Sequence, residues 1–259
     1  MLLDSTIDEL LTIRYADLQR FSQASPRLRR FLNETEYDLA TGSYIRNGQL
    51  VPNAEIKQIL ELEQQRVTRQ FEDATTEYLD GDITVEEWER RIIDEQKTAG
   101  IIAVLFALGG IAFLMSNRNR GVILRGVGDR LRASGKGVSG FGTLLSNGDR
   151  SPKRLKAYVR YKARDIRPTF NSVAHEGRKL AGYNEGRRFL DPSVVKHCES
   201  CPGYERREWV PIDEIVPVGV DCECAGRCKC WVQYRFNLNR EGPLRAIRNT
   251  NSLNQQFFN

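Results

Sequence analysis

All six cysteines of this chain lie in one short segment, between residues 198 and 230. They read Cys198-x2-Cys201, then 20 intervening residues, then Cys222-x-Cys224-x3-Cys228-x-Cys230. Cysteines that serve only as small buried apolar side chains have no reason to gather, so the clustering indicates that the sulfurs are needed close together. Two kinds of chemistry need this: a tetrahedral metal site and a set of disulfides.

Zinc is the preferred interpretation of this cluster. Two residues of spacing in Cys198-x-x-Cys201 let both sulfurs bind one ion, and Gly203 relaxes the turn that follows. A second group of sulfurs about 20 residues later supplies the remaining ligands. His197 competes with the thiols for the four places. The candidate zinc ligands are Cys198, Cys201, Cys222, Cys224, Cys228 and Cys230.

Other roles for the cysteines are open but less favoured. Disulfides and free thiols are the two alternatives to a metal. A redox pair fits poorly, because such a pair normally opens a helix after a strand, whereas Cys198 follows a loop that contains Pro192. A catalytic zinc keeps one position open for water or substrate, and this segment offers too many sulfurs rather than too few.

The composition is that of an ordinary globular protein, with 28% charged and 40% hydrophobic residues. The 259 residues suffice for one large domain or two modest ones. A net charge of +5 is only mildly basic and does not by itself indicate a nucleic-acid-binding protein. Met1-Leu2-Leu3 is followed at once by Asp4, so we expect no signal peptide and synthesis in a reducing cytoplasm, which favours zinc over disulfides.

Helical periodicity dominates the first half of the chain. Apolar spacing predicts helix over 1–32, broken at Ser25-Pro26, and a long helix over 54–79. Between them, Asn47-Gly48 lies in an apolar context and predicts a short β-hairpin over 44–51. Thr84 and Glu87 have the spacing of a capping box that opens the next helix.

The segment from Ala99 to Met115 holds 17 residues without a charge. A membrane span needs about 20 residues, so this one is at the lower limit, and it carries Gly109-Gly110. We favour a central helix of a bundle, because its first part continues a capped amphipathic helix. Membrane insertion is the alternative.

The region 117–150 is rich in Gly, Arg and Ser, and predicts a loose connector or mobile arm. A basic helix follows it. Across 151–188 there are eleven Lys or Arg and three Asp or Glu, a local charge of +8. A solvated helix face explains this, and so does a surface for phosphates or an acidic partner. The candidate contact residues, spaced to share one face, are Lys156, Arg160, Arg164 and Arg167.

The predicted fold class is therefore mainly α: a helical bundle with a short N-terminal β-hairpin and a small cysteine-rich β module near the C-terminus. A further helix over 169–182 belongs to the bundle, and alternation from Trp231 to Phe236 predicts a strand in the module. The expected units are 1–53 with the N-terminal helix and hairpin, 54–188 with the helical domain, 189–236 with the zinc-type module, and 237–259 as a polar tail.

Four segments together resemble a known family, the minor head or head-morphogenesis proteins of tailed bacteriophages (the phage Mu F-like group). Between them they span roughly residues 40 to 236. They are Tyr44-Ile45-Arg46-Asn47-Gly48-Gln49-Leu50-Val51; Gly81-Asp82-Ile83-Thr84-Val85-Glu86-Glu87-Trp88 with its helix up to Leu108-Gly109-Gly110; Arg167-Pro168-Thr169-Phe170-Asn171 with Ala174-His175-Glu176-Gly177; and Arg188-Phe189-Leu190-Asp191 leading to the cysteines, Gly203-Tyr204 and Trp209-Val210-Pro211-Ile212.

The resemblance implies a structural virion protein with a few copies per particle, located at the portal or on the inner capsid face during head assembly. Expected partners are the portal protein, the major capsid protein and packaged DNA, with no small-molecule substrate. The family commonly closes its cysteine segment with His-Pro-x-Cys-x-Cys, whereas this chain has Val218-Gly219-Val220-Asp221 before Cys222 and adds Cys228 and Cys230. Which pair closes the site is therefore open.

Nothing in the sequence points to catalysis. The chain has no Gly-x-Ser-x-Gly and no P-loop, and its two histidines are His175, which reads as a packing residue, and His197 beside Cys198. We expect a structural protein rather than an enzyme. A zinc-ribbon nucleic-acid-binding protein and a membrane-inserting virion protein used in DNA delivery are the alternative functions.

Overall fold

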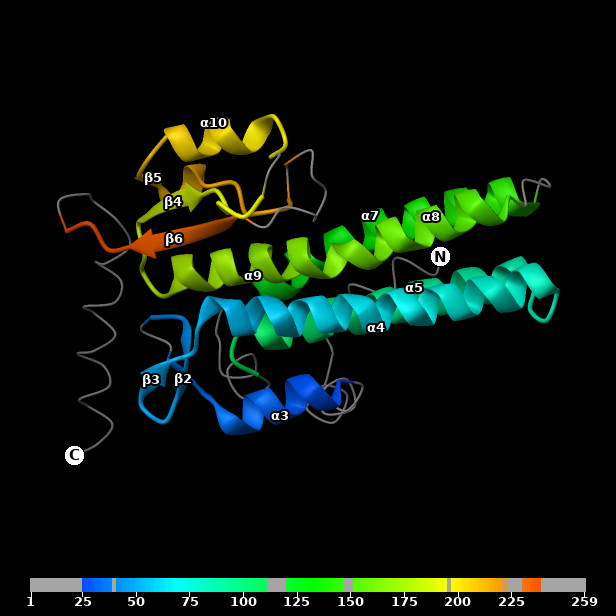
Figure 1. Cartoon of the computed structure of the whole chain (residues 1–259), viewed down its shortest axis with the longest axis horizontal. Coiled ribbons are helices and arrows are strands. Elements are labelled where there is room, and N and C mark those ends of the chain that lie inside the picture. The colour runs from blue at the N-terminus through cyan, green and yellow to red at the C-terminus, as the bar shows by residue number, and fades with distance from the viewer. Residues whose placement is uncertain are drawn as a thin grey trace.

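The computed structural model describes residues 25–38, 41–110, 120–146, 151–194, 197–220, 222 and 230–238, with the backbone alone for 120–125 and 129–134. Long helices make up the body, and two small antiparallel sheets lie at one end of it (Figure 1). The predicted fold class, mainly α with a small β module, is therefore confirmed. The helix expected over 1–24 lies outside the described residues.

The first sheet follows a short helix, α3 (Pro26–Glu34), which the Ser25 hydroxyl caps by accepting from the Leu28 amide. Its strands are β1 (Glu36–Asp38), β2 (Ser43–Arg46) and β3 (Gln49–Leu50), in that order. Asn47 and Gly48 have φ values of 52° and 75°, the two left-handed positions of a tight hairpin turn. The predicted hairpin therefore forms.

Two long helices, α4 (Asn53–Asp80) and α5 (Val85–Ala107), run antiparallel to each other (Figure 1). Gly81 ends α4 with a φ of 83°, a conformation that glycine adopts without the steric penalty of a Cβ. Trp88 is fully buried between the two helices and donates its indole N–H to Thr75 Oγ1 at 3.1 Å. Burial of this large ring, with its polar group satisfied, fixes how the hairpin packs.

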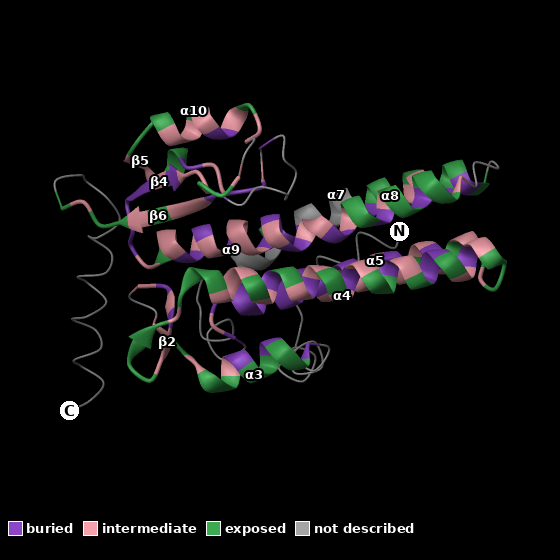
Figure 2. Cartoon of the chain, in the orientation of Figure 1, coloured by how far each residue is buried: buried purple, intermediate pink, exposed green. Residues whose placement is uncertain are grey.

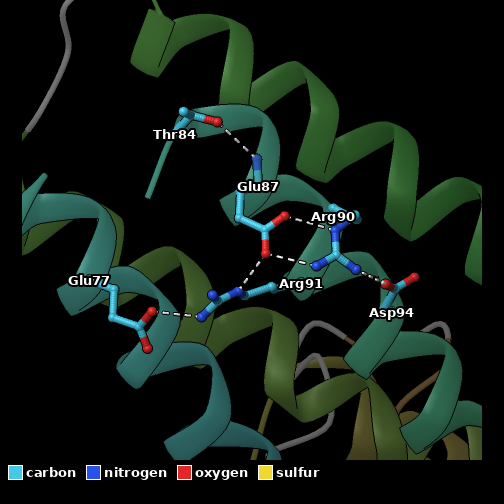
Figure 3. Close-up of polar contacts among 6 residues, drawn as sticks. All are labelled: Glu77, Thr84, Glu87, Arg90, Arg91 and Asp94. Carbon is cyan, nitrogen blue, oxygen red and sulfur yellow. Dashed lines mark hydrogen bonds and ion pairs between the residues drawn. The ribbon is translucent and has the colours of Figure 1, made fainter. Parts of the chain in front are cut away.

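Half of the predicted capping box is present at the start of α5 (Figure 3). The Thr84 hydroxyl accepts from the Glu87 amide at 3.3 Å, as expected. The Glu87 carboxylate instead accepts from Arg90 and Arg91, because guanidinium groups one turn along the helix compete with the backbone amide. Arg91 also donates to Glu77 of α4 at 2.7 Å. These contacts with Arg90 and then Arg91 lower the pKa of Glu87 to about 2.

The apolar stretch lies inside the helical body. Residues 99–108 are buried, as expected for a central helix of a bundle (Figure 2). The described helix ends at Ala107, followed by Gly109 with a φ of 78°, and residues 111–115 lie outside the described part. Among the helices that the structure describes, none has the length and apolar character required to cross a membrane.

The prediction of a loose connector over 117–150 is wrong for most of that region, because Arg120–Ser146 is a helix, α7. It packs against α5 and against α9 (Ile166–Leu180). Val138 and Leu145 of α7 are completely or almost completely buried in the main core. Glycines lower the intrinsic helix propensity of the segment, but burial of its apolar positions outweighs that cost.

A second layer is made by α8 (Pro152–Lys162), the single turn η1 (Ala163–Asp165) and α9, which follow one another almost in line (Figure 1). Leu155 and Val159 of α8 face the main core, and α9 lies against α5. The helix predicted over 169–182 is therefore present and begins a few residues earlier.

The second sheet lies beside α9 (Figure 1). Its strands, in the order β5-β4-β6, are β4 (Glu185–Phe189), β5 (Val210–Pro211) and β6 (Trp231–Arg235). The helix α10 (Ser200–Arg206) lies between β4 and β5 in the chain. The turn η2 (Ile212–Glu214) lies between β5 and β6. The strand expected from Trp231 is confirmed as β6, whereas β4 and α10 were not predicted.

Candidate metal centre

The second sheet brings together the four cysteines that the structure describes. Cys198 precedes α10, Cys201 lies in its first turn, Cys222 follows a turn after η2, and Cys230 directly precedes β6. Their side chains pack in one cluster with Val218 and neighbouring apolar residues. The two arms of the cysteine segment therefore meet in space, as predicted. Cys224 and Cys228 lie outside the described residues.

The four described cysteines are free and form no disulfide with one another. The sulfur atoms of Cys198 and Cys201 are 3.2 Å apart, well beyond the about 2.05 Å of a disulfide bond. A tetrahedral zinc site has sulfur–sulfur edges of about 3.8 Å and sulfur–nitrogen edges of about 3.6 Å. The Cys230 sulfur lies 3.7 Å from Nδ1 of His197, which matches the second of these.

The described residues supply two pairs of candidate zinc ligands but not a complete ligand set. Within the described ranges, no three His, Cys, Asp or Glu side chains are arranged to hold a metal ion. The spacing of His197 and Cys230 is compatible with zinc, whereas the 3.2 Å between the sulfurs of Cys198 and Cys201 is shorter than the sulfur–sulfur edge of such a site. The donor chemistry, thiols with one imidazole, is that of structural zinc sites.

Two N–H groups are directed at the sulfurs, and sequence reasoning missed both. Arg188 of β4 is 2% exposed, and its Nη1 donates to the sulfurs of Cys222 at 3.5 Å and Cys201 at 3.9 Å. The Gly219 amide donates to Cys222 at 3.1 Å. Arg188 and the Gly219 amide therefore place two N–H donors against the sulfur of Cys222. Arg188 lies in the motif Arg188-Phe189-Leu190-Asp191, but nothing in its spacing signals burial.

The Cys198-x-x-Cys201 pair does open a helix, α10, contrary to the expectation from sequence. Residues 190–194, which follow β4, form neither helix nor strand, as expected for a loop. The helix forms despite Pro202 and Gly203, because proline is tolerated in the first turn, where the amide has no partner within the helix. Spacing alone therefore does not decide between a zinc knuckle and a redox pair.

His175 is a packing residue, as predicted. It is 5% exposed on α9, and its Nδ1 lies 3.0 Å from the Tyr234 hydroxyl of β6. Burial first, and the charge of Lys179 second, lower the pKa of His175 to about 4. The neutral ring ties the helical body to the second sheet.

The four basic residues predicted to share a contact surface have different surroundings. Arg160 of α8 forms an ion pair with Glu72 of α4. Lys156 is exposed and Arg164 is partly exposed. Arg167 lines a cavity between the helices and the two sheets. The break at η1 separates α8 from α9, so the four side chains do not belong to one regular helix.

Comparison with known proteins gives no match to any protein-family model, any curated protein or any solved structure.

Proposed function

We propose that this chain is a structural virion protein, a minor head protein that acts in the head assembly of tailed bacteriophages near the portal or the inner capsid face. The single observation that supports it most is the cysteine cluster, which joins two arms of a small module beside a long helical body. The four sequence segments that resemble the family fall on the first sheet, α4–α5, α9 and this module. The proposal assigns no catalytic step.

Zinc would act as a cross-link within this module. Cys198 and Cys201 would hold it from one side, with His197 and the group from Cys222 to Cys230 supplying the other ligands. The sheet has strands of only two and five residues, too little to bury a core of its own. A metal bound to both arms would then stabilise the module as a unit.

A contact with DNA or with an acidic surface of another head protein fits the basic residues of α8 and η1. The side chains of Lys156 and Arg164 have no hydrogen bond or ion pair with any described residue. The alternative of a zinc-ribbon nucleic-acid-binding protein rests on the same residues. Membrane insertion is the less favoured alternative, because it would have to expose residues 99–108, which are packed in the interior.

The test is co-expression with the portal and major capsid proteins of a tailed bacteriophage. Purified heads are expected to contain this protein in a few copies each. A Cys201→Ser variant would show whether incorporation needs the module, and Lys156→Gln with Arg164→Gln whether it needs the basic surface. Complete heads that exclude the protein at every expression level would contradict the proposal.

A further inference from the structure

A cavity of about 460 Å³ lies where the first sheet, the start of α4, α9 and strand β6 come together. Figure 1 shows the two sheets on either side of α9 and α4 at this end of the body. The volume of the cavity is within the range of roughly 300–1,000 Å³ that is typical of ligand-binding sites. It is partly open to solvent. Of the described cysteines that would bind zinc, only Cys230 lines it.

The charged side chains that line the cavity are all cationic among the described residues: Lys57 of α4, and Arg167 and Arg178 of α9. Lys57 is 3.9 Å from Asp191, and Arg178 donates to the Ser43 hydroxyl at 3.4 Å. Arg167 is partly buried, and its side chain forms no hydrogen bond or ion pair with any described residue. A partly desolvated guanidinium of this kind is stabilised when an anionic group binds beside it.

The wall formed by β6 identifies the kind of ligand. Four consecutive residues, Trp231 to Tyr234, line the cavity. Because successive side chains of a strand point to opposite faces, a run of consecutive lining residues means that the cavity borders the edge of the strand. β6 ends the order β5-β4-β6, so within the described residues its outer edge is not paired with another strand. Such an edge offers backbone amides and carbonyls to a further strand.

We propose that this cavity binds an extended acidic peptide segment of a partner protein. The segment adds to the open edge of β6 through backbone hydrogen bonds, and its carboxylates meet Arg167 and Arg178. Apolar side chains of the segment contact the aromatic part of the wall, formed by Tyr44, Phe106 and Phe170. A phosphate would satisfy the arginines but not the strand edge, whereas an acidic peptide satisfies the arginines with its carboxylates and the strand edge with its backbone. The inference does not depend on zinc or on a role in head assembly.

The test uses the full-length protein and a fluorescently labelled hexapeptide of alternating glutamate and valine, with binding measured by anisotropy. A peptide of alternating glutamine and valine is the matched control for charge. We expect the glutamate peptide to bind at least about tenfold more tightly, the factor expected for loss of one charge-assisted hydrogen bond. Arg167→Gln should weaken binding of the glutamate peptide by a similar factor. Arg69→Gln makes the same charge change at an exposed residue outside the cavity and should leave the affinity unchanged.

Hydrogen exchange locates the bound peptide. Amides of Val232 to Tyr234 are expected to gain protection when the glutamate peptide is added, while those of α8 do not. Equal affinity for the two peptides, or equal loss on Arg69→Gln and Arg167→Gln, would overturn the proposal. So would a short DNA duplex that binds in an Arg167-dependent manner while the glutamate peptide does not bind.

Discussion

Replacing Leu145 by alanine tests whether α7 packs into the hydrophobic core or behaves as a loose connector. Leu145 is 1% exposed in the main core, whereas its neighbour Leu144 is 47% exposed. The substitution removes three carbon groups, worth about 2.4 kcal/mol at about 0.8 kcal/mol each, and a cavity adds to this, so we expect a loss of about 3 kcal/mol. Leu144→Ala has the same effect on helix propensity and should change stability by less than about 0.5 kcal/mol.

Urea unfolding followed by circular dichroism measures the free energy of unfolding of both variants, and thermal unfolding measures their Tm. For a chain of this size, about 3 kcal/mol corresponds to a fall in Tm of roughly 6–12 °C for Leu145→Ala. The difference between the two variants matters more than either value, because both act on the same helix. If Leu145→Ala and Leu144→Ala were equally harmless, the packing of α7 described above would be refuted, and 117–150 would behave as the loose connector that its composition predicts.

Three further perturbations test the cysteine-rich module, the buried His175 and the packing of Gly109 at the end of α5. Cys201→Ser should make residues 190–236 sensitive to protease and leave the long helices resistant; an unchanged digestion pattern would argue against a metal clamp. The pKa of His175 in the folded state, about 4, is below the usual 6.5, so the unfolded state takes up the proton first and the free energy of unfolding falls as pH decreases. From pH 7.5 to 5 we expect a loss of about 2 kcal/mol. Urea unfolding should show that this loss is absent in His175→Gln. Gly109→Ala should lower Tm more than Gly48→Ala, because both have positive φ but only at Gly109 would a Cβ meet another side chain, that of Tyr37; equal losses would contradict this packing.

Local patterns predicted the elements whose signals lie within a few residues. Asn47-Gly48 identified the hairpin, Thr84 the start of α5, and the alternation after Cys230 the strand β6. Each depends on backbone geometry or a cap that neighbouring residues determine. The family resemblance and the zinc ligands stay predictions.

The remaining features depend on packing between distant segments. Composition suggested a connector for α7, because the buried positions Val138 and Leu145 are far apart among glycines and only the facing helices make them a core. The strand β4 was hidden by Arg187 and Arg188, which read as surface residues. Arg188 is buried because its guanidinium contacts the sulfurs of Cys201 in α10 and of Cys222 beside Gly219. These residues are distant in sequence, so the residues next to Arg188 give no sign of its burial.

Metal content tests the central claim, that the cysteine cluster is a zinc-stabilised module. The measurement is elemental analysis of the purified full-length chain, paired with a thiol count before and after chelation. The account predicts about one zinc per chain, with the ligand thiols reacting only after the metal is removed. Absence of metal, with all six thiols reactive at once or with none reactive until a reductant is added, would contradict it.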